Sequence, residues 1–173
     1  MPSLIGIGDD SVPVTVQARV AARPEQVFAA VVPIDLSLIF TGWGPFPGVR
    51  QTVDQTGAWD APGQTRRPLL SDGSTAHEVL TEHTPPHSFA YEITGFTNIL
   101  RMLVHGVRGE WTFTPDGSGT LIRWCYEFKA RPGATRLVRT AVATPWRLYM
   151  RQALRLAARV AEQPPQHSKD HQR

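Results

Sequence analysis

The chain has 173 residues, of which 41% are hydrophobic and 19% are charged. These values are typical of one globular domain and exclude a disordered chain. The net charge is only +3, and the basic residues are spread along the chain, so we expect no nucleic-acid binding. A single cysteine, Cys125, allows no internal disulfide and fits a reducing compartment.

No segment of the sequence has the pattern of a targeting signal or a membrane span. Residues 1–10 have neither a basic start nor an apolar core, so we expect no signal peptide. The longest apolar stretch, residues 27–34, contains Pro33 and is too short to cross a bilayer. We therefore expect a cytoplasmic protein without integral membrane association.

The first predicted elements are one strand and two short helices. Apolar residues alternate over residues 12–20, which predicts a half-buried strand. Pro24 fits the first turn of a short helix that Pro33 ends, and Asp35 is placed to cap a second one over residues 36–40.

The loop that follows, residues 41–48, is rich in glycine and proline but carries Trp43 and Phe46. Exposed aromatic side chains are costly unless they cover something. We therefore expect this loop to lie over the interior of the protein.

A series of strands separated by turn residues comes next. The turns, such as residues 71–74 and 115–119, have the spacing of consecutive hairpins, so the sheet should be antiparallel. The predicted strands span residues 49–54, 64–70, 75–82, 89–94, 104–114 and 120–129.

From residue 135 to residue 163 the apolar period changes to that of a helix, and Pro145 should kink it. Arginines at 147, 151, 155 and 159 form a stripe. We interpret this stripe as the solvated back of the helix, although it could instead attract an anionic membrane or a partner. The expected domain is 12–163, after an extension, 1–11, and before a disordered tail, 164–173.

This order of elements resembles the START-like helix-grip (SRPBCC) superfamily, in particular its polyketide cyclase/dehydrase and lipid-transport-like branch. The segments that carry the resemblance lie mostly at turns and core positions. They are Arg23–Phe28, Pro47–Val49, Gly63–Arg66, Asp72–Ser74, Pro85–Tyr91, Trp111–Phe113 and Gly119–Thr120. The resemblance implies an α+β fold in which a curved antiparallel sheet of about seven strands wraps around the long C-terminal helix. It also implies a deep pocket for a lipid, polyketide or similar molecule, but no particular activity.

Hairpin geometry predicts which side chains face that pocket. If Asp72 and Gly73 are the centre of their turn, Arg67 lies opposite Glu78 and Leu69 opposite Ala76. The next turn places Leu80 opposite Tyr91 and Glu78 opposite Ile93. A bulge would reverse part of this pattern and turn Arg66 and His77 inward instead.

The candidate ligand-binding residues combine this face with the aromatic faces of the last two strands and the helix. They are Arg67, Leu69, Glu78, Leu80, Phe89, Tyr91, Ile93, Trp111, Phe113, Trp124, Tyr126, Trp146 and Tyr149. Residues 40–46, residues 95–102 and the helix near Trp146 should form the entrance.

The charged candidates allow two interpretations. Arg67 and Glu78 could anchor a polar group of a ligand, or they could form a cross-strand ion pair that fixes the register. Glu78 and Tyr91 are candidates for acid–base chemistry, although buried tyrosines more often only pack. The histidines lack metal-ligand spacing, and there is no nucleotide or cofactor motif, so we expect neither metal nor cofactor.

Three hypotheses of function follow. The first is a carrier or sensor that binds a hydrophobic small molecule in an internal cavity. The second is an enzyme of the polyketide cyclase, aromatase, dehydratase or isomerase type that uses the same cavity. The third is an interaction module whose pocket is closed, which predicts a cavity too small for a ligand.

Overall fold

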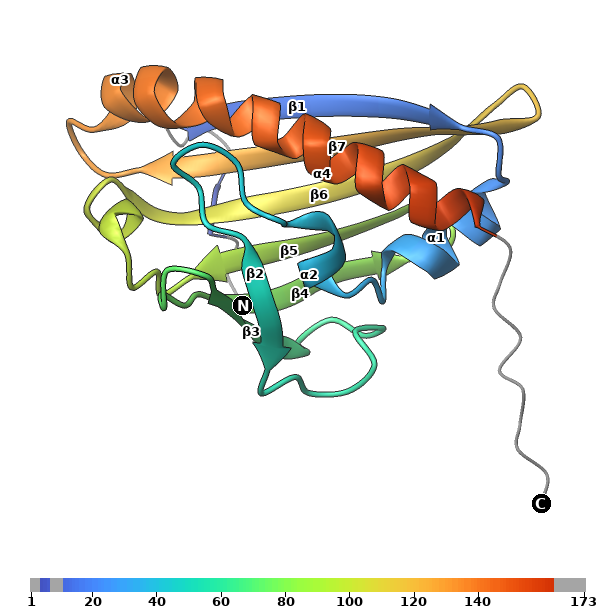
Figure 1. The fold of residues 1–173 in the computed structure, drawn as a ribbon, viewed down its shortest axis with the longest axis horizontal. Coiled ribbons are helices and arrows are strands. Elements are labelled where there is room, and N and C mark those ends of the chain that lie inside the picture. Colours follow the sequence, from blue (N-terminus) through green and yellow to red (C-terminus); the bar gives the residue numbers. More distant parts are fainter. Residues whose placement is uncertain (1–3, 7–10, 164–173) are drawn as a thin grey trace.

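The computed structural model describes residues 4–6 and 11–163 (Figure 1). Seven strands form one antiparallel sheet in the order β1-β7-β6-β5-β4-β3-β2. The strands are β1 (Ser11–Val20), β2 (Val49–Val53), β3 (Thr65–Leu70), β4 (His77–Thr84), β5 (Ser88–Thr94), β6 (Val104–Asp116) and β7 (Gly119–Ala130). The predicted tail and most of the predicted N-terminal extension lie outside the described residues.

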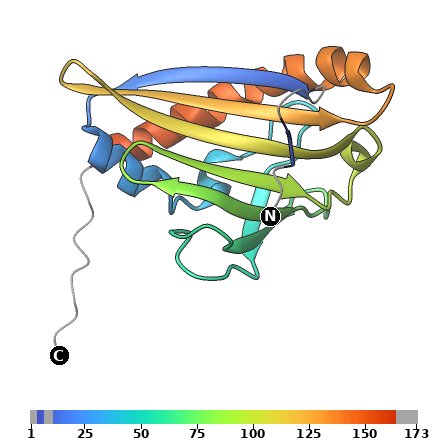
Figure 2. The same cartoon turned by 180° about the vertical axis from the view of Figure 1, so that it is seen from behind.

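The helices cover one face of this sheet. The long helix α4 (Thr144–Glu162) crosses it, and α1 (Pro24–Val31) and α2 (Leu36–Ile39) follow β1 (Figure 1). Among the residues that the structure describes, no helix lies on the other face (Figure 2). The predicted α+β helix-grip architecture is therefore confirmed. No helix among the described residues is long and apolar enough to cross a membrane.

The start of each short helix follows from its sequence. Pro24 occupies the first turn of α1, where its missing N–H costs no hydrogen bond. The Asp35 carboxylate accepts a hydrogen bond from the Ser37 N–H at 2.9 Å and caps α2, as predicted.

The segment before α4 departs from a regular helix. A short helix α3 (Thr135–Leu137) leads into a π-helical segment η2 (Val138–Ala143), and α4 begins at Thr144. Pro145 lacks an N–H and its ring crowds the preceding turn. The structure therefore has a wide π-helical turn before Pro145 in place of a simple kink within one helix.

The hairpin between β3 and β4 corrects the predicted register. Arg66 pairs with Glu78, and Leu69 forms a bridge with Thr75, so the predicted pairing of Arg67 with Glu78 is wrong by one residue. The cause is a three-residue loop, residues 71–73, in which Gly73 has a φ of +83°. A slip of one residue turns every side chain of β3 to the opposite face.

The hairpin between β4 and β5 has the predicted register at the candidate site residues. Leu80 lies opposite Tyr91 and Glu78 opposite Ile93, as predicted. The pairing shifts only beyond Leu80, where Glu82 lies opposite Ala90. Glu78 and Tyr91 therefore share the face that the helices cover.

Candidate functional site: an apolar cavity beside a buried ion pair

A cavity of about 100 Å³ lies between the sheet and the helices. Its walls come from strands β2, β3, β4, β5 and β7, from α2 and the loop after it, from the segment before β6, and from the helical region around Trp146. The lining residues are Leu36, Phe40, Phe46, Pro47, Val49, Pro68, Leu70, Ala76, Glu78, Ile93, Phe96, Asn98, Leu100, Tyr126, Phe128, Val142, Trp146 and Tyr149. Glu78 is the only acidic or basic side chain among them, so this is an apolar cavity with one charged wall.

Trp146 of α4 is the aromatic centre of the cavity wall. Its ring centroid lies 5.0 Å from those of Phe46 and Tyr126 and 5.3 Å from that of Tyr149. It also stacks on Phe40 at 6.4 Å and 17°. The Trp146 Nε1 atom is buried without a hydrogen-bond partner among the described residues, which leaves one donor unused in this wall.

Tyr149 attaches the glycine- and proline-rich loop to α4. Its hydroxyl accepts a hydrogen bond from the Gly42 N–H at 2.9 Å and donates one to the Pro47 carbonyl at 3.2 Å. Gln152, three residues along α4, donates to the Thr41 hydroxyl at 2.9 Å. These contacts hold Phe46 over the cavity, as the aromatic content of the loop suggested.

Glu78, the charged residue of the cavity wall, forms a buried ion pair. Arg66 of β3 donates from Nε to Glu78 Oε2 of β4 at 2.6 Å, and both side chains are less than a tenth exposed. The Arg66 guanidinium carbon also lies 3.9 Å from the ring centroid of Trp59, a cation–π contact. Charge pairing and this contact offset part of the cost of burying both groups.

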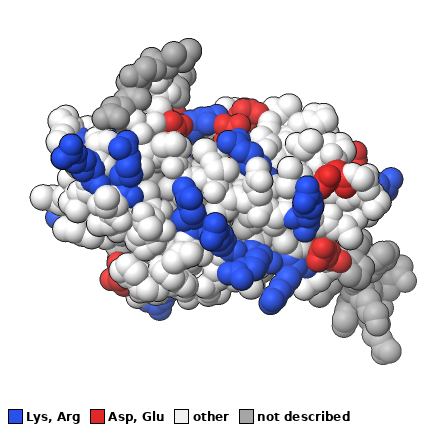
Figure 3. Space-filling model, turned by 90° about the horizontal axis from the view of Figure 1, so that it is seen from above, with Lys and Arg blue, Asp and Glu red and all other residues white. Residues whose placement is uncertain are grey.

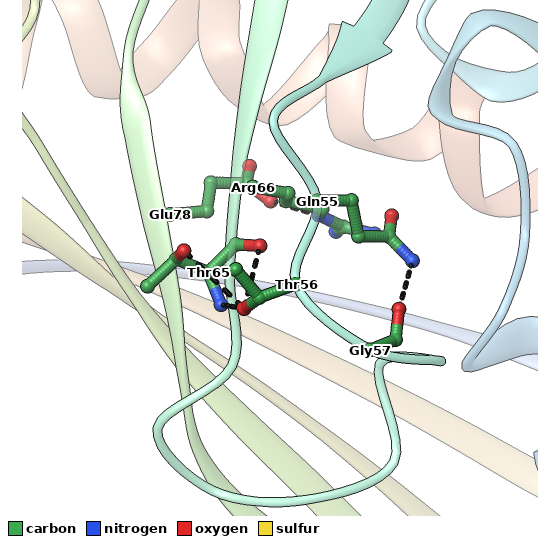
Figure 4. Close-up of polar contacts among 6 residues, drawn as sticks. All are labelled: Gln55, Thr56, Gly57, Thr65, Arg66 and Glu78. Carbon is green, nitrogen blue, oxygen red and sulfur yellow. Dashed lines mark hydrogen bonds and ion pairs between the residues drawn. The ribbon is translucent and has the colours of Figure 1, made fainter.

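Trp59 reaches Arg66 from an irregular loop, residues 54–64. It is 1% exposed and has a φ of +62°, a conformation that a bulky residue adopts only under strain. Figure 4 shows the loop beside the ion pair, with Thr56 hydrogen-bonded to Thr65 of β3. Gln64 closes the loop by accepting from the Asp60 N–H and donating to the Asp60 carboxylate, both at 2.8 Å.

The ion pair lies between two voids. Glu78 lines the main cavity, whereas Arg66 lines a second void of about 20 Å³ with Phe89, Tyr91 and Trp111. Leu36 and Phe40 line both voids. A thin wall of these side chains therefore separates the two spaces.

Two buried tyrosines lie on the strands beyond Glu78 in the sheet. Tyr91 of β5 lies opposite Gly109 of β6, which in turn lies opposite Tyr126 of β7. A Cβ atom on Gly109 would lie 2.3 Å from Tyr91 Cζ, so the ring covers this glycine. The Tyr91 ring therefore occupies the space that a side chain at position 109 would need.

Burial keeps both phenols protonated. It is the main cause that raises the pKa of Tyr91 and of Tyr126. The Glu78 carboxylate raises both pKa values further, and for Tyr91 the nearby indoles of Trp111 and Trp124 oppose the shift. Burial also raises the pKa of Tyr149, against the hydrogen bond from Gly42. Tyr91 and Tyr126 can therefore serve as neutral hydrogen-bonding groups beside a carboxylate.

The structure places eleven of the thirteen predicted site residues in the interior, in three groups. Glu78, Ile93, Tyr126, Trp146 and Tyr149 line the main cavity. Phe89, Tyr91 and Trp111 line the small void. Leu80, Phe113 and Trp124 are buried but line neither.

Aromatic packing explains why Phe113 and Trp124 line neither void. Trp111 stacks on Trp124 at 4.5 Å and on Phe89 at 5.9 Å. Phe113 stacks on Phe89, and Phe28 of α1 meets both phenylalanines edge-on. Stacked rings therefore fill most of the interior beneath α1, where only the small void remains, and the main cavity lies in the other half.

The predicted inward orientation of Arg67 and Leu69 is wrong, because the β3–β4 register differs by one residue. Arg67 is exposed and pairs with Asp54. Leu69 is half-buried and lines a separate pocket together with Arg50. Pro68 and Leu70 take their place in the cavity wall.

The structure also adds residues that sequence reasoning missed. The sequence pattern predicts an inward Arg66 only in the reversed register, and it predicts no role for Trp59. Gly73 was no sufficient signal for Arg66, because an Asp-Gly pair fits a two-residue hairpin loop as well as a three-residue one. For Trp59 the available signal was a single tryptophan in an otherwise polar, glycine-containing loop. The three segments predicted to form the entrance all contribute to the cavity lining, through Phe40, Phe46, Phe96, Leu100 and Trp146.

Other kinds of site find no support in the described part of the chain. No group of three His, Cys, Asp or Glu side chains there could hold a metal ion. Cys125 is half-buried on the face opposite Trp124 and Tyr126, and its Sγ lies 3.5 Å from the Thr15 hydroxyl.

Comparison with solved structures shows the same fold in proteins of low sequence identity. Ara h 8.0201 matches with a TM-score of 0.67 and 14% identity over 88% of this chain and 98% of that one. Norcoclaurine synthase from Thalictrum flavum matches with a TM-score of 0.66 and 14% identity over 95% and 96%. The di-domain ARO/CYC protein BexL of the BE-7585A biosynthetic pathway matches at 0.65 and 23% over 90% of this chain and 51% of that one.

A search of curated protein sequences found no match. A family model described as "Polyketide cyclase / dehydrase and lipid transport", in contrast, matches residues 11–162. This span contains every strand of the sheet and all of α4. The chain belongs to the polyketide cyclase/dehydrase and lipid transport family.

Proposed function

We propose that the protein binds a hydrophobic small molecule, such as a lipid or polyketide, in the cavity and acts as a carrier or sensor. The observation that carries this proposal is an apolar cavity with a single carboxylate, Glu78, in its wall. Such a site suits a molecule with an apolar body and one hydrogen-bond donor. Family membership supports the same class of ligand.

The size of the cavity sets a condition on this function. Pockets for drug-sized ligands usually measure about 300–1,000 Å³, whereas the cavity measures about 100 Å³. A larger ligand has to displace the wall of Leu36 and Phe40 or move the loop that Tyr149 holds. The structure is then the closed form, and binding opens it.

A fluorescent apolar probe, 1-N-phenylnaphthylamine, tests this proposal when titrated into the purified protein. Ala76 is 5% exposed and lines the cavity, so Ala76→Leu should fill it and weaken probe binding at least tenfold. The matched control is Ala29→Leu, because Ala29 is exposed on α1; its affinity should stay unchanged. Equal affinity in all three proteins, or no binding to any, would overturn the proposal, the second result favouring an interaction module with a closed pocket.

The alternative is an enzyme that folds or dehydrates a polyketide-like substrate in this cavity. Glu78 favours it, because a carboxylate beside the neutral phenols of Tyr91 and Tyr126 can exchange protons with a substrate. In this alternative Arg66 positions Glu78 and does not touch the substrate.

Turnover of a synthetic linear polyketone, followed by mass spectrometry, tests the alternative. Glu78→Gln and Tyr91→Phe should each lower the rate by about 10²-fold or more. Glu110→Gln serves as the control, because Glu110 pairs with Arg108 away from the cavity. Rates are compared below the temperature at which each variant unfolds, and an unchanged rate in both test variants rejects these two assignments.

A further inference from the structure

One end of the molecule exposes large aliphatic side chains. Ile99 and Met102 in the short 3₁₀ helix η1 (Ile99–Met102) are 76% and 63% exposed, and Leu137 in α3 is 50% exposed. These are three of the five exposed large hydrophobic residues among those described. Both elements lie at the same end in two opposite views (Figures 1 and 2).

Hydrogen bonds connect the two segments that carry this aliphatic patch. Arg131, in the turn that leads to α3, donates from its backbone N–H to the Leu103 carbonyl at 2.8 Å. Its Nε atom donates to the Arg101 carbonyl, also at 2.8 Å. The patch of Ile99, Met102 and Leu137 is therefore held on one connected part of the fold.

The same end is strongly basic. Arg101, Arg131, Arg136 and Arg139 are exposed, and residues 94–106 and 129–143 contain no Asp or Glu. Asp72, on the adjoining β3–β4 turn, uses its carboxylate to accept hydrogen bonds from Ser74. Figure 3 shows basic side chains at the α3 end of the upper face and a separate row of them along the face that α4 forms.

This end also adjoins the cavity. Leu100, between Ile99 and Arg101, lines it, and so does Val142, in the π-helical segment directly after α3. A surface pressed against the patch would therefore lie beside the cavity wall.

We propose that this end docks on an anionic lipid bilayer. The aliphatic side chains insert at the boundary between headgroups and acyl chains, and the four arginines lie among the phosphates, the usual division of roles in peripheral membrane binding. A nucleic acid fits less well, because the exposed side chains between the arginines are aliphatic and offer no stacking surface for bases. The inference goes beyond the proposed function, because docking does not require an occupied cavity.

Sedimentation with lipid vesicles tests this inference on the full chain. Vesicles with about 30% phosphatidylglycerol in phosphatidylcholine should bind the protein, and pure phosphatidylcholine vesicles should bind it at least tenfold more weakly. Arg101→Glu/Arg136→Glu should lose at least tenfold in affinity for the anionic vesicles. Ile99→Ser/Met102→Ser should lose the part of the binding that persists at high salt.

The matched control is Arg151→Glu/Arg155→Glu, which makes the same charge change at exposed positions along α4. Its affinity should stay within about threefold of the parent. An equal loss in the control, equal binding to neutral vesicles, or no vesicle binding overturns the proposal. Probe binding in the cavity should be unchanged in the Arg101→Glu/Arg136→Glu variant, so that a failure of docking is distinguishable from a failure of the proposed function.

Discussion

At the scale of single residues, the buried pair of Arg66 and Glu78 is the feature of the site that costs the most free energy to bury. Its partners come from neighbouring strands, and Trp59 covers the guanidinium group. An exposed pair provides a direct comparison, because Arg67 of β3 pairs with Asp54, the residue after β2. The two arginines are adjacent in sequence, but only the one that β3 turns inward depends on its acidic partner.

Glu78→Gln should lower the free energy of unfolding by about 3–5 kcal/mol, because it leaves the Arg66 charge buried and unpaired. Asp54→Asn should cost less than about 1 kcal/mol, because Arg67 remains in solvent. Urea unfolding of both variants measures the difference. Similar small losses would show that the Arg66 charge is not buried in solution.

The contact between Tyr91 and Gly109 gives a second test at this scale. Gly109→Ala should lower the free energy of unfolding by about 1–3 kcal/mol, because the new methyl group overlaps the Tyr91 ring. The same substitution should cost less in a Tyr91→Leu background, since the ring is then absent. Additive losses in this double-mutant cycle would contradict the contact.

The tyrosines make stability fall at high pH. Burial raises the pKa of Tyr91, Tyr126 and Tyr149 in the folded protein above the unfolded value of about 10. The unfolded state therefore loses protons first, and above about pH 10 each buried tyrosine removes up to about 1.4 kcal/mol of stability per pH unit. Absorbance at high pH should show the phenols ionising together with unfolding, and normal ionisation near pH 10 in the folded protein would contradict their burial.

At the scale of elements, local patterns predicted most of the fold, because each pattern has a local physical cause. Alternating apolar residues indicated β1, Asp35 indicated the start of α2, and hairpin spacing indicated the antiparallel order. The β3 register was not predictable from the same signals, because two- and three-residue loops fit Ser71 to Ser74 equally well until the conformation of Gly73 is known. The conformation of Gly73 sets the length of this loop, and the loop length determines whether the side chain of Arg66 or of Arg67 points into the interior.

The loop over the cavity, residues 40–48, is one of the two elements that a larger ligand would displace in the proposed function. Tyr149→Phe removes the hydroxyl that accepts from Gly42 and donates to Pro47, which should cost about 1–2 kcal/mol. Hydrogen exchange of residues 40–48 should become faster, while exchange in the β6–β7 hairpin stays the same. Unchanged exchange in the loop would show that other contacts hold it.

At the scale of the whole molecule, the sheet and α4 enclose more aromatic side chains than line the cavity. The sequence predicted that the aromatic faces of β5, β6 and β7 point inward, and they do. It could not predict which rings line a void and which fill one, because this depends on how rings from distant segments stack. Phe28 of α1 and Trp111 of β6 fill one half, and the cavity of about 100 Å³ remains in the other.

The proposed function requires that this remaining space hold a hydrophobic molecule. Native mass spectrometry of the freshly purified protein, followed by extraction and identification of anything bound, tests it most directly. The spectrum should show a species heavier than the chain by one small apolar molecule with a hydrogen-bond donor, and this species should be lost in Ala76→Leu. A wild-type protein that carries nothing and takes up no apolar compound added to it would contradict the claim.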